Sequence, residues 1–471
     1  MDITLVNLPA KRFRYTSLGV LPPLGVAYLA SALLEGGHNV DIIDIPASDL
    51  SLEDFRRLIR HKKSRIYGIS STLFGFQDVI NFSEAIKGEV PGALIVLGGL
   101  CTVLPAEDIL KNIPAVDIVI PGEGEEPLRQ LCEIVSCDGD LKEAKGIFFR
   151  GGGGALCYSG KTQRQKSDYF PAYSLLDMKK YYLHPPFGVS FPVASMETSR
   201  GCPFGCRFCC LSKSYRPREI ERVIEEMAYL KQNYGVNEIY FVDHTFTISA
   251  ERISALCREI IKRGIKIVWS CKTRVDLVSG DLLRRMRKAG CYMISYGVES
   301  GSEKILKNLN KGISVKDIEN TMSLTRKYGI RSVAYMIVGS PGETRETIKE
   351  SLALIKRIKP DYVLYNALAP DPGSELFSDA VNNKIVEKDF FKNAVFSGED
   401  KDWPLYSTPE FSSSDVEFWV KKGTREFYFN IPYVFRSLAR IRSMNELKII
   451  LRGARILLSD IFFGKDKYLI N

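Results

Sequence analysis

Several features are missing from this sequence of 471 residues, and each absence excludes a class of protein. No run of eighteen apolar residues occurs, so a membrane-spanning helix is not expected. The N-terminus lacks the basic region that precedes the apolar segment of a signal peptide, which predicts a cytoplasmic protein. The formal net charge of +9 is modest and is not gathered into a run, so no nucleic-acid partner is expected.

Histidine is scarce, whereas cysteine is not. The four histidines are His38, His61, His184 and His244, and they are far apart in the sequence. Eleven cysteines in a long chain do not suggest the disulfide framework of a small secreted domain and are typical of a reducing compartment. A hydrophobic content of 45% supports sizeable cores, and the length suits two or three domains.

Three of the cysteines stand within eight residues, at Cys202, Cys206 and Cys209. A tetrahedral zinc site would need a fourth protein ligand, and no histidine lies near in the sequence. A 4Fe–4S cluster needs only these three thiolates, because its fourth iron can stay open for an exogenous ligand. The alternative is a loop of reduced cysteines that pack together. The adjacent Cys210 is expected to point away and to be structural.

The spacing Cys-x3-Cys-x-aromatic-Cys, with Phe208 as the aromatic residue, resembles the signature of radical S-adenosylmethionine (SAM) enzymes. The resemblance implies that the open iron chelates the amino and carboxylate groups of SAM. It also implies an electron donor of the flavodoxin or ferredoxin type, whose electron leads to a 5′-deoxyadenosyl radical.

Residues 1–136 alternate short apolar runs with amphipathic segments, which predicts an α/β domain with a doubly wound parallel sheet of the flavodoxin type. Ligands of such sheets bind at the carboxyl ends of the strands. The expected strands lie near residues 3–8, 40–44, 65–70, 93–98 and 117–121, and the expected helices near 24–36, 51–62, 76–88, 105–111 and 125–136.

Small and hydroxyl residues gather at this predicted edge, where turn glycines and helix caps are the simpler interpretation. The pattern, including the segments 22–30 and 122–125, resembles the cobalamin-binding domain of many radical SAM enzymes. Leu100 and Cys101 follow the glycine pair, where many relatives have a histidine shortly after it. The residues that the resemblance places at cobalamin are Ser70, Ser71, Thr72, Gly98, Gly99, Gly122, Glu123 and Gly124.

Residues 137–193 are predicted to be a connector with a glycine-rich hairpin, and residues 194–372 a partial (β/α)6 barrel. Chemistry in such barrels lies at the carboxyl ends of the strands, where the cysteine loop falls. The expected strands lie near 194–199, 237–242, 266–271, 292–298, 332–338 and 361–366, and the expected helices near 217–234, 250–263, 281–289, 314–328 and 344–358.

Other strand ends of the barrel resemble family segments that line the SAM pocket. The resemblance places Asp243, Arg274, Glu299, Ser300, Gly339 and Gly342 at this cofactor. Arg274 can pair with the methionyl carboxylate, and the backbone near Gly339 is expected to pass close to the adenine. Helix capping and surface ion pairs are the alternative. His244, next to Asp243, departs from the family pattern, and no catalytic side chain is assigned.

Residues 373–471 are predicted to form a helical region. A capping box from Ser443 to Glu446 opens an amphipathic helix with a basic side. Such a helix can lie on an anionic membrane, as a peripheral contact, or dock on its own protein.

Together these resemblances imply a cobalamin-dependent radical SAM enzyme that methylates an unactivated carbon of a small-molecule or lipid-like substrate. Oxidative cyclisation or ring rearrangement with the same cofactors is the alternative. Transfer of a methylthio group to tRNA fits less well, because the N-terminal region has too few cysteines for a second cluster. The loop 9–23 contains no histidine, so cobalt is expected to lack a protein imidazole below it.

Overall fold

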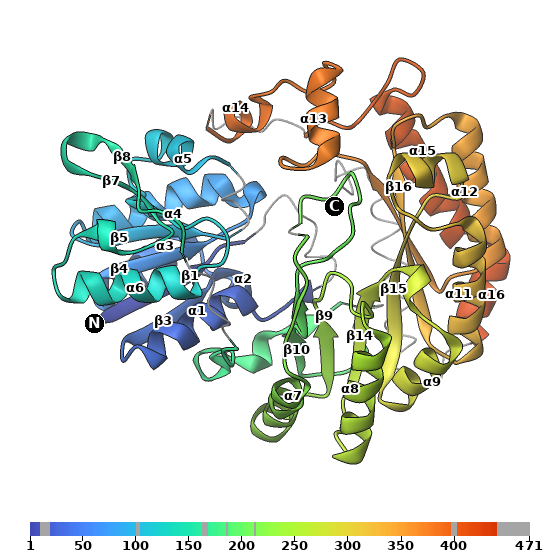
Figure 1. Ribbon diagram of the computed structural model, residues 1–471, viewed down its shortest axis with the longest axis horizontal. Helices are drawn as coiled ribbons and strands as arrows, with labels where there is room; N and C mark the ends of the chain where they lie inside the picture. Colours follow the sequence, from blue (N-terminus) through green and yellow to red (C-terminus); the bar gives the residue numbers. More distant parts are fainter. Residues whose placement is uncertain are drawn as a thin grey trace. The chain divides into compact units, whose positions relative to one another are not determined.

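The computed structural model describes residues 1–9, 19–99, 104–162, 168–184, 187–211, 213–396 and 403–439. The chain divides into two compact units, shown in Figure 1: residues 1–181 with 389–401, and residues 182–388 with 402–471. The domain limits predicted at residues 136, 193 and 372 stay predictions. Cys101 and the predicted helix that follows Ser443 lie outside the described residues.

The first unit is built on a seven-stranded sheet, and its first five strands are parallel. The spatial order β3-β1-β4-β5-β6-β7-β8 gives these five the flavodoxin-like arrangement, so the predicted doubly wound sheet is confirmed. The predicted hairpin adds β7 and β8 as antiparallel strands beside β6. The bounds are β1 Asp2–Asn7, β3 Asn39–Asp44, β4 Ile66–Ser70, β5 Leu94–Gly98, β6 Ile118–Val119, β7 Phe148–Arg150 and β8 Leu156–Tyr158.

Helices cover this sheet in pairs. Apolar residues of α1 and α6 join one buried cluster with Ile3, Leu5 and Ile118 of the strands. Helices α3 and α4 pack against each other through Phe55 and Phe82, whose ring centroids are 4.8 Å apart. The helices of this unit are α1 Leu24–Glu35, α2 Ile45–Ser48, α3 Leu52–Lys62, α4 Phe76–Glu89, α5 Ala106–Asn112, α6 Glu125–Ser136 and α14 Phe390–Phe396.

The second unit is built on a six-stranded sheet whose spatial order, β10-β13-β14-β15-β16-β17, follows the sequence. All neighbouring strands are parallel, and right-handed crossovers then place every connecting helix on one face. The predicted partial (β/α)6 barrel is thereby confirmed. The bounds are β10 Val193–Met196, β13 Glu238–Phe241, β14 Val268–Thr273, β15 Cys291–Glu299, β16 Arg331–Val338 and β17 Tyr362–Ala367.

The helices of the second unit continue beyond the last strand, as predicted for the C-terminal region. No helix among the described residues is both long and apolar enough to cross a membrane. The helices are α7 Ile220–Tyr234, α8 Ala250–Lys262, α9 Gly280–Lys288, α10 Glu303–Asn308, α11 Val315–Lys327, α12 Arg345–Ile358, α13 Glu375–Asn382, α15 Ser413–Tyr428 and α16 Ile431–Ala439.

The helix predicted to begin at Pro217 begins at Ile220 instead. Pro217 belongs to the short strand β12, Arg216–Pro217, which pairs antiparallel with β11, Ser199–Arg200. The N–H of Arg218 also donates to the carbonyl of Thr198 at 2.9 Å. A proline suits both a first helical turn and an edge strand, and in this structure Pro217 is in the strand. This pairing closes the cysteine loop at its base.

Candidate cofactor sites

The three predicted cluster ligands lie in a loop at the carboxyl end of the first barrel strand. Cys202, Cys206 and Cys209 are all free thiols and partly exposed. Gly201 begins the loop with φ +79°, a conformation that favours glycine. Within the loop the N–H of Cys209 donates to the carbonyl of Cys206 at 3.1 Å. The thiol of Cys202 lies 3.4 Å from the hydroxyl of Thr245, in the segment that follows the next strand, β13.

Arg207 ties this loop to the rest of the unit. Its backbone N–H donates to the carbonyl of Leu309 at 3.1 Å, and its guanidinium donates to the carbonyl of Asn308 at 3.0 Å. The guanidinium also pairs with Glu375 at 2.7 Å and with Asp379, both on α13. The loop is therefore fixed on two sides, which suits ligands of a rigid cluster. Sequence analysis did not single out Arg207, and nothing in its pattern signals this role.

Arg274 lies beside the cysteine loop and is buried. Its guanidinium carbon is 4.0 Å from the centroid of the Phe204 ring, and Nη1 is 4.0 Å from the sulfur of Cys206. Nε and Nη2 donate to the carboxylate of Asp276 at 2.9 and 3.0 Å, and Nη2 also donates to the carbonyl of Lys311 at 2.6 Å. Most of its donors thus hold protein groups, and its pairing with the SAM carboxylate stays a prediction.

Glu299 forms a buried ion pair with Lys311, in which Nζ and Oε1 are 2.7 Å apart. Lys311 Nζ lies 5.8 Å from the ring centroid of Phe208, a residue that stands between Cys206 and Cys209 in the sequence. Burial raises the pKa of the Cys206 thiol, while the positive charges of Lys311 and Arg274 lower it. Lys311 was missed by sequence analysis, because a lysine in an Asn-Lys-Gly turn is normally exposed.

Two other predicted SAM residues are held by neighbouring protein groups. The carboxylate of Asp243 accepts from the N–H and hydroxyl of Thr198, at 2.9 and 2.8 Å, and from the hydroxyl of Ser199 at 2.6 Å. Burial raises the pKa of Asp243, and these donors oppose that rise. Ser300 Oγ lies 3.1 Å from Ser351 Oγ and accepts from a backbone N–H two residues on. Both arrangements position the strand ends, and cofactor contact stays a prediction.

The fifth strand ends in a tight turn. Gly339 and Gly342 both have positive φ, +99° and +75°. The carboxylate of Glu343 accepts from the N–H groups of Gly339 and Ser340 at 2.5 and 3.0 Å. Burial nevertheless raises the pKa of Glu343 to about 7. The side-chain amide of Asn308 donates to the carbonyl of Pro341 at 2.8 Å, so this turn and the cysteine loop are tied to the same residue.

The donor set fits an iron–sulfur cluster. Three free thiols share one short loop, burial raises the pKa of Cys206 and Cys209, and the buried cations Arg274 and Lys311 stand beside the loop. Among the described residues no group of three His, Cys, Asp or Glu side chains converges on a single metal ion. The thiolates of a cluster bind different iron atoms, so they need no common point. His244 is exposed. Partial desolvation of its ring by neighbouring protein atoms, followed by the positive charge of Lys272, lowers its pKa.

The carboxyl edge of the first sheet brings together the predicted cobalamin residues of β4 and β5. Gly99 has φ +91°, and a Cβ there would lie 2.7 Å from the carbonyl oxygen of Ser71. A Cβ at Gly98 would make only an ordinary contact, 3.7 Å from the carbonyl oxygen of Ile120. Thr72 Oγ1 is buried and has no hydrogen-bond partner among the described residues. Ser70 also lies at this edge, and Ser71 is buried.

The turn after β6 lies at the same edge. Gly122 has φ +81°, and apart from its chain neighbours no atom of the described residues lies within 4 Å of the Cβ it lacks. Glu123 is exposed, and Gly124 precedes α6. Open glycines and an unpaired hydroxyl fit the close approach of a large ligand with many polar groups, as cobalamin has. Binding by each of these residues stays a prediction.

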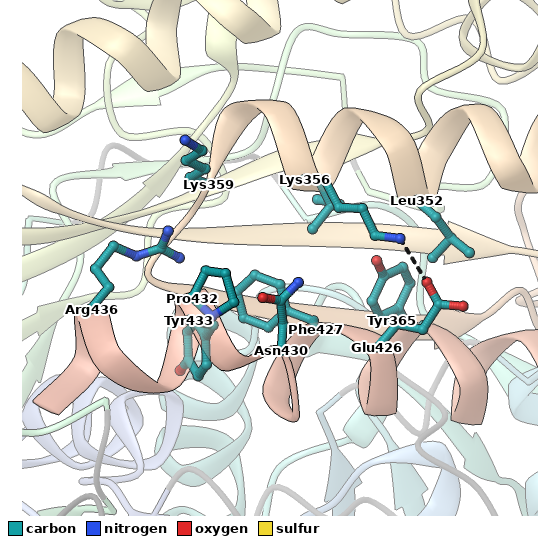
Figure 2. Close-up of a pocket in the computed structure, with 12 residues that line it drawn as sticks. Leu352, Lys356, Lys359, Tyr365, Glu426, Phe427, Asn430, Pro432, Tyr433 and Arg436 are labelled. Carbon is teal, nitrogen blue, oxygen red and sulfur yellow. Dashed lines mark hydrogen bonds and ion pairs between the residues drawn. The ribbon is translucent and has the colours of Figure 1, made fainter.

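A separate cavity of about 290 Å³ lies between α12, β17 and the helices α15 and α16. Figure 2 shows Lys359 and Arg436 at one end of it and the ion pair between Lys356 and Glu426 at the other. None of the predicted cofactor residues lines it.

Family models match both units. A radical SAM superfamily model matches residues 196–355, and a B12-binding domain model matches residues 13–132. The first match contains the cysteine loop and every predicted SAM residue. The second contains the predicted cobalamin edge.

Curated relatives match over most of the chain. An uncharacterized methyltransferase of Pyrococcus horikoshii, PH0819, is 31% identical over 93% of this chain and 95% of its own length. The anaerobic magnesium-protoporphyrin IX monomethyl ester cyclase of Cereibacter sphaeroides is 30% identical over 92% of this chain and 72% of its own length. Hopanoid C-3 methylase of Methylococcus capsulatus is 27% identical, over 75% and 68% respectively.

Among solved structures, the cobalamin-dependent radical SAM enzyme OxsB with aqua-cobalamin bound matches with a TM-score of 0.74. It is 19% identical and covers 98% of this chain and 72% of its own. At this identity the match supports the fold.

Proposed function

This chain belongs to the radical SAM enzymes that carry a cobalamin-binding domain, and from that premise we propose that it methylates an unactivated carbon of a small-molecule or lipid-like substrate. The cofactors of this family are a 4Fe–4S cluster, SAM and cobalamin. When bound, they supply a 5′-deoxyadenosyl radical that takes a hydrogen atom and a cobalt-borne methyl group that replaces it. The protein positions these groups and excludes side reactions.

The observation that carries the proposal is the fixed loop of free cysteines in a chain that also has the open sheet edge. Cys202, Cys206 and Cys209 would hold the cluster. Arg207 holds the loop in place, and Arg274 and Lys311 place positive charge beside it. We propose that Gly98, Gly122 and the edge around them admit cobalamin.

The names of relatives support methyl transfer. One is a methyltransferase by name, and another is a methylase that acts on a hopanoid, a lipid. We propose a substrate of this broad kind, with electrons from a donor of the flavodoxin or ferredoxin type. Peripheral membrane contact through the C-terminal segment has no supporting observation among the described residues and is not part of the proposal.

The test is turnover by the anaerobically reconstituted enzyme, with SAM that carries a deuterated methyl group and a panel of lipid and porphyrin candidates. Methylation predicts a product heavier by one labelled methyl group, together with 5′-deoxyadenosine and S-adenosylhomocysteine. Substrate-dependent 5′-deoxyadenosine without label in the product would contradict methyl transfer.

The second candidate is oxidative cyclisation with the same cofactors. The cyclase of Cereibacter sphaeroides favours it, since the similarity to this chain spans both units. The same assay separates the two, because cyclisation leaves the methyl label out of the product. We do not propose tRNA methylthiolation, because Cys101 and Cys132 are too few in the N-terminal region for a second cluster.

A further inference from the structure

The Glu299–Lys311 ion pair lies in the barrel beside the cysteine loop, and its burial and backbone conformation are both unfavourable to folding. Both side chains are 7% exposed, and burial of two charges is compensated only by close pairing. Glu299 has φ +65°, a left-handed conformation that is strained for a residue with a side chain. Strand register with β16 shifts at this point. The fold therefore holds this carboxylate in place against both burial and backbone strain.

Room for the pair comes from a glycine. A Cβ at Gly297 would lie 2.4 Å from Glu299 Oε1 and 2.6 Å from Lys311 Nζ, so the charged atoms rest directly over the Gly297 backbone. The carbonyl of Lys311 accepts from Arg274, which also faces the sulfur of Cys206. The pair and Arg274 thus form one connected group of buried charges at one corner of the cysteine loop.

We propose that Lys311 and its counter-charge Glu299 set the reduction potential of the cluster, as positioning residues that act through the field at Cys206. The inference rests on the cluster of the proposed function. The oxidised cluster takes one electron from a low-potential donor and forms or breaks no bond. Its net charge becomes more negative, so a nearby cation favours the reduced state and a nearby anion opposes it.

Two single variants should shift the potential in opposite directions. Lys311→Met leaves Glu299 uncompensated and should lower the midpoint potential. Glu299→Gln keeps the shape and an acceptor oxygen, frees the lysine charge and should raise it. We expect about a tenfold change in the reduction equilibrium in each case, about 59 mV for one electron. The measurement is electron paramagnetic resonance of the reduced cluster during a redox titration without SAM.

A structural role alone would not give shifts of opposite sign. The double variant Lys311→Met/Glu299→Gln should return close to the wild-type potential, and Lys311→Arg should stay there. Lys356→Met removes one partner of an ion pair at 3.0 Å on the surface and is the matched control, which should leave the potential unchanged. If Lys311→Met does not retain a cluster, the potential of Glu299→Gln alone tests the inference.

Equal potentials in the wild type and in Glu299→Gln, or shifts of the same sign in both single variants, would overturn the inference. A wild-type protein that assembles no cluster would instead overturn the proposed function. The two failures are therefore distinct.

Discussion

At the scale of single residues, Cys210 provides a control inside the cysteine loop. It is an exposed free thiol next to Cys209. Replacing Cys202, Cys206 or Cys209 with alanine should remove a cluster ligand and abolish both the cluster and the formation of 5′-deoxyadenosine. Cys210→Ala should retain both. Iron and sulfide analysis with absorbance after anaerobic reconstitution makes the comparison, and a full cluster in Cys206→Ala would show the ligand assignment to be wrong.

Glu343 predicts a pH dependence of stability. Burial raises its pKa from the ordinary 4.5 to about 7, so between these pH values the native state holds a proton that the unfolded chain has lost. Stability from this group is therefore complete below pH 4.5 and falls as the pH rises toward 7, by about 3 kcal/mol. Glu343→Gln cannot ionise and should lose this dependence. Unfolding temperatures of the two cluster-free proteins across this range test it, and parallel curves would refute the assignment.

Residue roles at the site were the least predictable part of the sequence. The cysteine spacing predicted a cluster loop because the three candidate ligands lie close together in the chain. Arg274 and Asp243 were recognised as residues of strand ends, but their partners Asp276, Thr198 and Ser199 could not be foreseen. Hydrogen bonds of side chains depend on the three-dimensional neighbourhood, which one-dimensional patterns do not contain.

At the scale of elements, the last residue of β5, Gly98, and the glycine that follows it, Gly99, should respond differently to substitution. Gly99→Ala adds a side chain at φ +91° and 2.7 Å from the carbonyl oxygen of Ser71, so it should destabilise the first unit by about 1–3 kcal/mol.

Gly98→Leu has room at Cβ and should fold normally, but its side chain would occupy the carboxyl edge of the sheet, where we propose that cobalamin binds. We expect its cobalamin affinity to fall at least about tenfold. Unfolding temperature and titration with hydroxocobalamin separate the two effects, and normal cobalamin binding by Gly98→Leu would count against this edge as the site.

Most helices and strands were predicted to within a few residues, because their apolar periodicity is strong and their ends carry caps such as Ser249 and Ser279. The start of α7 was wrong because Pro217 pairs with β11, a contact between segments on either side of the cysteine loop. The hairpin was predicted, but its addition to the sheet as β7 and β8 depends on pairing with β6. The pairing of strands that are distant in the sequence depends on the tertiary structure, which the local sequence does not specify.

At the scale of the whole molecule, the predicted cofactor residues divide between the two units. The cysteine loop and the SAM residues lie in the second, and the cobalamin edge lies in the first. Residues 389–401 return to the first unit, where Phe396 contacts Phe76 and Lys392 pairs with Asp108 at 2.8 Å. The sequence gives no sign of this return, since the partners are about three hundred residues apart.

The first unit also bears on how cobalt is held. His38 precedes β3, and His61 stands in the last turn of α3, which leads back to the start of β4. Both therefore lie at the amino end of the sheet, opposite the edge with Gly98 and Gly122. The loop 9–23 after β1 contains no histidine in its sequence. No imidazole of this unit is thus placed to reach a cobalt atom at the carboxyl edge.

We therefore expect bound cobalamin without an imidazole ligand from this unit, and with its dimethylbenzimidazole tail displaced from cobalt. Bound at the edge with Gly98 and Gly122, the cofactor would supply the methyl-carrying chemistry of the proposed function. The electron paramagnetic resonance spectrum of bound cob(II)alamin should then show cobalt lines without nitrogen superhyperfine splitting. Triplets on these lines that persist in His184→Ala and His244→Ala but disappear in His38→Ala or His61→Ala would show that a histidine of the first unit reaches the metal. That result would contradict the placement of cobalamin at the carboxyl edge of the sheet.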